Sequence, residues 1–123
     1  MQHQLVQYQP QDDDEESDRL SKVGDHFLRR FSCSGCLVDI NKAVSHHEHA
    51  VCLTPDDHTD KPLRLSNLGN SFAIRFGHAG DPMDVEKAIS HHEHAVHLTP
   101  DGHSDKPRYL NYLGISLLGW FEH

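Results

Sequence analysis

The stretch SHHEHAV occurs twice in the chain, at Ser45–Val51 and at Ser90–Val96. The two copies lie 45 residues apart, and many glycine, proline and large apolar residues recur at the same distance. The recurring pairs include Pro55 and Pro100, Gly24 and Gly69, Gly69 and Gly114, Phe27 and Phe72, and Phe31 and Phe76. Self-similarity at a fixed period predicts an array of structural repeats. We therefore expect repeat units at 17–61 and 62–106, followed by half a unit at 107–123.

The first part of each unit carries apolar residues at helical spacing. The stripe consists of Leu65, Leu68, Gly69, Phe72 and Phe76, and it recurs as Leu20, Val23, Gly24, Phe27 and Phe31 and as Leu110, Leu113, Gly114, Leu117 and Phe121. This spacing predicts a helix over about 63–76. A glycine inside a helix costs about 1 kcal/mol relative to alanine. Its recurrence within the stripe indicates that a neighbouring helix approaches closely at this point.

A second helix is expected in each unit, over about 82–98 and over about 40–51. Asp81 can cap the later of these helices, and Pro82 suits its first turn. No stretch shows the alternating pattern of a β-strand. We therefore predict an all-α protein, an α-solenoid of about five antiparallel helices. Residues 1–16 are rich in glutamine and then in acidic residues, which predicts a disordered tail.

The composition argues against several classes of protein. The net charge is −8 and there is no basic patch, so we do not expect nucleic acid as a partner. No apolar run approaches the ~20 residues that a membrane span needs, and the N-terminus is unlike a secretory signal. The three cysteines do not form a disulfide framework, which favours a cytoplasmic location.

The repeat resembles a known family. The matching residues are Leu68, Gly69 and Phe72 in the first helix and Ala88, Ala95 and Pro100 in and after the second. Their order resembles the tetratricopeptide (TPR) pattern. The segment AVHLTPDGHSDKP, followed by LNYLG, is similar to the long TPR-like repeats of basidiomycete fungal proteins, which often accompany a CHAT peptidase domain. The resemblance implies a non-catalytic scaffold for protein–protein interaction, without a cofactor.

The resemblance also implies where a partner binds, because TPR-like stacks use the concave surface formed by their first helices. The positions beside the core stripe on that surface are Asp25, Arg29, Asn67, Asn70, Ile74, Tyr112 and Ile115. Asn67 and Asn70 resemble the asparagines with which some TPR domains hold a peptide carboxylate. The lysines and arginine of that clamp are not at matching places.

The clustered histidines suggest a metal site at first sight. On a helical wheel His92 lies within the apolar stripe, His91 at its edge and His94 almost opposite. These side chains do not converge, so we predict no metal and expect His47 and His92 to be packing residues. A metal- or redox-responsive protein that uses the histidines or the C-x-x-C pair of cysteines at 33 and 36 is the alternative function.

The last predicted helix, over 108–123, adds apolar residues beside its core stripe. Leu118 and Trp120 are expected to form an exposed apolar surface, whereas a terminal repeat helix should present a polar face. This surface predicts either self-association through the helix or membership of a longer array. A piece of a larger protein without a function of its own is the third possibility.

Overall fold

The computed structural model describes residues 10–122, and within them it contains five helices and no strand. The helices are α1 (Pro10–Ser34), α2 (Leu37–Cys52), α3 (Lys61–Ala79), α4 (Pro82–Leu98) and α5 (Lys106–Glu122). The predicted all-α class is confirmed. Over the described residues, no helix combines the length and the apolar character that crossing a membrane requires.

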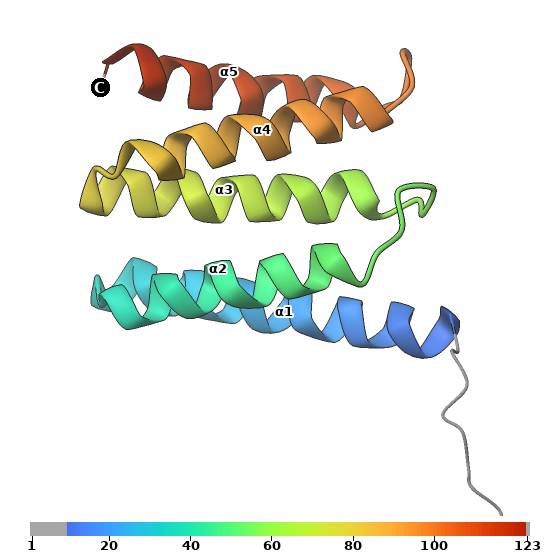
Figure 1. Cartoon of the computed structure of the whole chain (residues 1–123), viewed down its shortest axis with the longest axis horizontal. Coiled ribbons are helices and arrows are strands. Elements are labelled where there is room, and N and C mark those ends of the chain that lie inside the picture. Colours follow the sequence, from blue (N-terminus) through green and yellow to red (C-terminus); the bar gives the residue numbers. More distant parts are fainter. Residues whose placement is uncertain (1–9, 123) are drawn as a thin grey trace, which may run out of the picture.

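The helices lie side by side in chain order, and α1 and α5 occupy the two ends of the stack (Figure 1). The closest pairs are α1 with α2 and α3 with α4, while α3 also packs on α2 and α5 on α4. Further contacts join α1 to α3 and α3 to α5. The odd-numbered helices are therefore neighbours of one another, as well as of the even-numbered helices between them.

Local signals fix the boundary between α3 and α4. The carboxylate of Asp81 accepts a hydrogen bond of 3.0 Å from the backbone N–H of Met83, as the predicted cap should. Pro82 occupies the first helical position. Before it, Gly80 has a φ of 75° and donates its N–H to the carbonyl of Phe76 at 2.7 Å. This left-handed ending is one that glycine adopts without strain.

The predicted disordered tail differs from what the structure shows. Residues 1–9 lie outside the described part of the chain. From Pro10 onwards the segment is helical, so the acidic run Asp12–Glu16 belongs to α1. The first turn contains acidic residues, which interact favourably with the positive end of the helix dipole.

Contacts with α3 and the loop before it hold this acidic start of α1 in place. The carboxylate of Asp14 lies 2.7 Å from Nε2 of His58. Arg64, whose side chain is 4% exposed, lies 3.7 Å from the same carboxylate and donates a hydrogen bond to the hydroxyl of Ser17. Composition alone predicts disorder here, whereas these long-range partners stabilise a helix.

Two apolar clusters form the core. One contains Val44, Leu68, Phe72 and Ala88, from α2, α3 and α4. The other contains Leu65, Ala95 and Tyr109, from α3, α4 and α5. Three members of the stripe predicted for the first helix, Leu65, Leu68 and Phe72, are therefore buried in α3 and belong to the two clusters.

A histidine ring is packed directly on a glycine at two places in the stack. A Cβ atom added to Gly69 would lie 2.5 Å from Nε2 of His92, and one added to Gly24 would lie equally close to the ring of His47. The predicted close approach of a neighbouring helix is thus present at both glycines. At Gly114 no atom of another helix within residues 10–122 lies within 4 Å of the corresponding position.

We expect Gly69→Ala to destabilise the protein by about 1–3 kcal/mol, because the new methyl group must displace a buried and hydrogen-bonded ring. The matched change Gly114→Ala meets open space, so alanine's helix propensity should stabilise the protein by up to about 1 kcal/mol. Urea unfolding of both variants at low protein concentration measures the difference. Equal effects of the two changes would contradict the inferred contact between Gly69 and His92.

Candidate functional site: a groove across α1, α3 and α5

A groove of about 450 Å³ runs across the three odd-numbered helices. Its lining consists of Leu28 from α1, Asn70, Ala73 and Ile74 from α3, Tyr112, Ile115 and Ser116 from α5, and His92 from α4. Most of these side chains are apolar. Ile74 and Ile115 are 40% and 56% exposed, so a ligand in the groove can reach them.

The structure brings together four of the seven residues predicted on the concave surface, and they line this groove: Asn70, Ile74, Tyr112 and Ile115. Leu28 also lines it and was not predicted. Its neighbour Phe27 occupies the core stripe, and the sequence alone does not show that Leu28 faces α3 and α5. A groove wall that depends on three helices requires their packing to be known.

The other three predicted residues do not line the groove. Arg29 is exposed on α1. Asn67 is half-buried, and its backbone carbonyl accepts a hydrogen bond from the hydroxyl of Ser71 at 3.1 Å. Asp25 binds a buried histidine, as described below. Because Asn67 is not among the lining residues, the structure does not place both asparagines of a carboxylate clamp in this groove.

His92 of α4 connects the α3 wall of the groove to the α5 wall by hydrogen bonds. Its ring is 1% exposed, with Nε2 3.0 Å from Oδ1 of Asn70 and Nδ1 2.8 Å from Oγ of Ser116. The amide oxygen can only accept a hydrogen bond, so Nε2 carries the proton, and the hydroxyl donates to Nδ1. Both ring nitrogens are thereby paired in the neutral form, and Asn70 of α3 is tied to Ser116 of α5.

Burial determines the protonation of this ring. Desolvation lowers the pKa of the His92 imidazole from 6.5 to about 4, and a hydrogen bond with the backbone of Ser66 acts in the opposite direction. The ring is therefore neutral at neutral pH, which agrees with its two hydrogen bonds.

His47 has the same arrangement one helix pair earlier. Its ring is also 1% exposed, with Nδ1 2.6 Å from Oγ of Ser71 in α3. Nε2 lies 3.0 Å from Oδ1 of Asp25 in α1. The two sites differ in one respect, because a carboxylate stands where His92 has the amide of Asn70. A carboxylate stabilises a protonated ring, whereas an amide does not.

The remaining clustered histidines lie apart from these two. His46 stacks on Phe27 and His91 on Phe72, with ring centroids 5.5 Å and 5.7 Å apart. Nε2 of His94 lies 3.7 Å from a carboxylate oxygen of Asp56. Among residues 10–122 there is no group of three or more His, Cys, Asp or Glu side chains that could hold a metal ion. The three cysteines of the chain are exposed free thiols.

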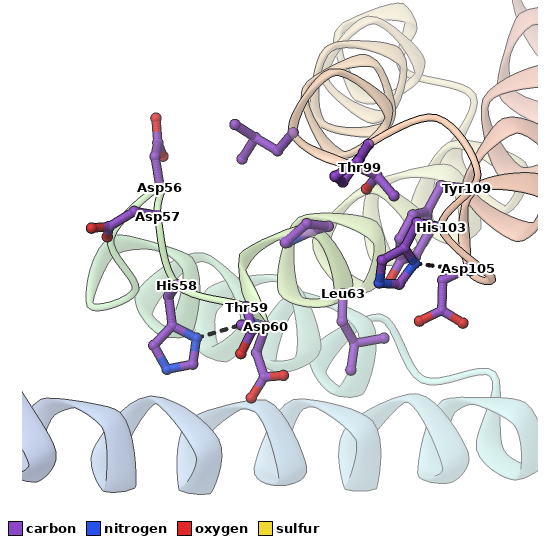
Figure 2. A pocket seen from close by; sticks show the side chains of 13 residues that line it. Asp56, Asp57, His58, Thr59, Asp60, Leu63, Thr99, His103, Asp105 and Tyr109 are labelled. Carbon is purple, nitrogen blue, oxygen red and sulfur yellow. Dashed lines mark hydrogen bonds between the residues drawn. The ribbon is translucent and has the colours of Figure 1, made fainter.

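A second hollow, of about 540 Å³, lies between the α2–α3 loop and the α4–α5 loop (Figure 2). Carboxylates of Asp56, Asp57, Asp60 and Asp105 surround it. Nδ1 of His58 accepts the backbone N–H of Asp60 at 2.9 Å, and Nδ1 of His103 accepts that of Asp105 at 3.0 Å. The histidines of this hollow therefore have a structural role in the turns. The sequence alone did not predict the hollow between these two loops.

The two residues predicted to form an apolar surface at the last helix are both exposed on α5. The exposed fractions are 60% for Leu118 and 43% for Trp120. Neither lines the groove.

The buried neutral His92 makes stability depend on pH. Because its pKa is lower in the folded chain, the unfolded chain binds more protons from about pH 6.5 down to about pH 4. The stabilisation is complete above this window and is lost as the pH falls through it. For His92 alone we expect a loss of about 2 kcal/mol at about pH 5, measured by urea unfolding.

One variant tests the cause of this pH dependence. Asn70→Asp gives His92 a carboxylate partner, so it should raise the pKa of the ring and reduce the loss of stability at acid pH. The titration of the His92 ring can be followed by NMR. An unchanged pH profile in this variant would disprove the role assigned to the surroundings of His92.

No protein-family model, curated protein or solved structure matches the chain. The function of the groove is therefore inferred from its own residues.

Proposed function

We propose that the protein is a non-catalytic scaffold for protein–protein interaction, built from TPR-like repeats, and that the groove receives a segment of the partner. The observation that carries this proposal is the groove itself, which crosses α1, α3 and α5 and is lined mainly by apolar side chains. Concave, largely apolar sites with a few polar groups are typical binding sites. A cytoplasmic location is part of the proposal and rests on the cysteine content of the sequence.

Matching contacts along the chain support a 45-residue repeat stacked as a solenoid. Thr54 and Thr99 each donate a hydroxyl hydrogen bond of 2.7 Å to the carbonyl four residues earlier. Lys61 and Lys106 each donate an ammonium hydrogen bond to the carbonyl of the threonine seven residues before. The same side chains thus end the second helix of each proposed unit and begin the first helix of the next.

The lining residues suggest the chemistry of the bound segment. Ile74 of α3 and Ile115 of α5 form an apolar part of the groove, which suits a large apolar side chain. Asn70 uses its amide oxygen for His92, so its NH₂ group is the donor for a backbone carbonyl of the ligand. We therefore expect an uncharged peptide segment with a bulky apolar residue.

The hydrogen bonds of His92 support a binding role for the groove instead of a catalytic one. A general base needs a free nitrogen within reach of a substrate proton. Both nitrogens of His92 are already paired, and the ring is buried.

Selection from a library of displayed random peptides tests the proposal. We expect the selected peptides to share a large apolar residue. Ile74→Asp and Ile115→Asp should each weaken their binding by about tenfold or more, because a charge would be buried against the ligand. Isothermal titration calorimetry with a selected peptide measures this effect.

Val38→Asp provides a matched control. Val38 is 55% exposed in the first turn of α2, outside the groove, and an acidic residue there is compatible with the helix dipole. Binding should be unchanged in this variant. Peptides that bind equally well to the wild type and to both groove variants would place the binding surface elsewhere and refute the proposed groove.

A further inference from the structure

One face of α5 forms an uncharged stripe at helical spacing. The stripe consists of Pro107, Leu110, Asn111, Gly114, Leu117, Leu118 and Phe121, all of which are exposed. Phe121 is 81% exposed and Leu110 is 48% exposed. α5 stands at one end of the stack, so this face is open in the described part of the chain (Figure 1). A contiguous exposed apolar face of this kind marks an interaction surface.

The equivalent face of α3 is covered. Leu65 and Phe72 stand 45 residues before Leu110 and Leu117, and each of them is 1% exposed. Gly69 is covered by the ring of His92 from α4. Gly114 follows Gly69 by the same distance, and a Cβ atom added to it would meet no atom of another described helix within 4 Å. α5 therefore has large apolar residues and a glycine at the positions where α3 packs against α4. Within the described residues, no helix packs on this face of α5.

α5 lacks the charged group with which α1 and α3 hold the helix that follows them. Arg75 of α3 donates two hydrogen bonds, of 3.0 and 2.9 Å, to the carboxylate of Asp84, and Arg30 of α1 lies 3.6 Å from that of Asp39. The corresponding residue of α5 is Trp120. A helix like α2 or α4 would bury an aspartate there without a partner, which is unfavourable.

α5 also lacks the polar residue that binds the buried histidine in α1 and α3. Asp25 and Asn70 bind Nε2 of His47 and His92, and the corresponding residue of α5 is Ile115. A docked histidine would lose this hydrogen bond. The face of α5 thus fits a helix that offers apolar residues, with neither the histidine nor the aspartate of α2 and α4.

We propose that this helix is α5 of a second copy of the chain, packed antiparallel and crossing at Gly114. Gly114 is the central residue of α5 (Lys106–Glu122). An antiparallel pair that crosses there places Leu110 level with Leu118 of the second copy, on both sides of the crossing. The stripe is uncharged along its whole length, so it is complementary to itself, as a two-fold interface requires.

The central glycine allows the two helices to approach closely. Without a side chain at the crossing, the backbones come together, as α4 approaches α3 over Gly69. Tyr112 and Ser116 of the groove lie on the side of α5 opposite the stripe, and Ile115 lies between the two faces. No residue of the stripe lines the groove, so the proposed dimer contact and the groove use different residues of α5.

Sedimentation velocity of the full chain tests the proposal, together with a charge-pair design. We expect the wild type to pass from monomer to dimer as its concentration rises. Leu110→Glu and Leu118→Lys should each remain monomeric, because a charge would be buried in the apolar interface. An equimolar mixture of the two variants should recover the dimer, because the introduced carboxylate of one copy meets the introduced ammonium group of the other. Val38→Glu, at an exposed residue of α2, should dimerise like the wild type.

Each other outcome overturns the proposal. A wild type that stays monomeric at high concentration excludes the interface, and a dimer that persists in both single variants places it on another face. A mixture that remains monomeric contradicts the antiparallel crossing. If circular dichroism shows that a variant has lost its helices, Gly114→Cys in a chain with serine at positions 33, 36 and 52 decides instead. Its oxidation should give a disulfide-linked dimer, and a monomeric product refutes the crossing at Gly114.

Discussion

A buried histidine that bonds to two other helices is the interaction on which the rest of this structure depends. His92 of α4 binds Asn70 in α3 and Ser116 in α5, and His47 of α2 binds Asp25 in α1 and Ser71 in α3. Each even-numbered helix is therefore tied to the odd-numbered helix on either side. A buried polar group must be hydrogen-bonded, so the ring specifies where both neighbours lie. The groove exists because this constraint keeps α3 and α5 side by side.

Each buried histidine ring also requires the glycine on which it packs. An imidazole and a Cβ atom cannot both occupy the space between the helices, so the absent side chain at Gly69 is as necessary as the ring of His92. The loss of helix propensity at the glycine is offset by the packing that it allows. α5 retains this glycine as Gly114, with its surface uncovered. The exposed stripe of α5 is thus an element of the packing scheme that has no partner within the described residues.

Much of the local structure could be predicted from the sequence because it depends on local signals. The helical spacing of apolar residues, the cap at Asp81 and the glycines within the stripes identify the helices and their close approach. The start of α1 could not be predicted, because its acidic residues are stabilised by His58 and Arg64, which are distant in sequence. The groove was only partly predictable. Helical spacing placed Ile74 and Ile115 on the right faces, whereas the role of Leu28 depends on how three helices pack.

The hydrogen bonds of the histidines also escaped prediction, and they distinguish two sites that the sequence presents as copies. Asp25 and Asn70 occupy the same geometry and differ by one charge. Repetition in sequence therefore need not mean identical electrostatic surroundings, and the two buried histidines differ in this respect.

The ties between helices also bear on the energetics of binding. Because Asn70 and Ser116 are already held by His92, the groove walls would have little freedom to lose in the proposed binding of a peptide. The conformational entropy of the walls was given up during folding, so binding needs to order mainly the ligand. A stack of five helices, which could otherwise flex at each interface, thus offers a preorganised surface.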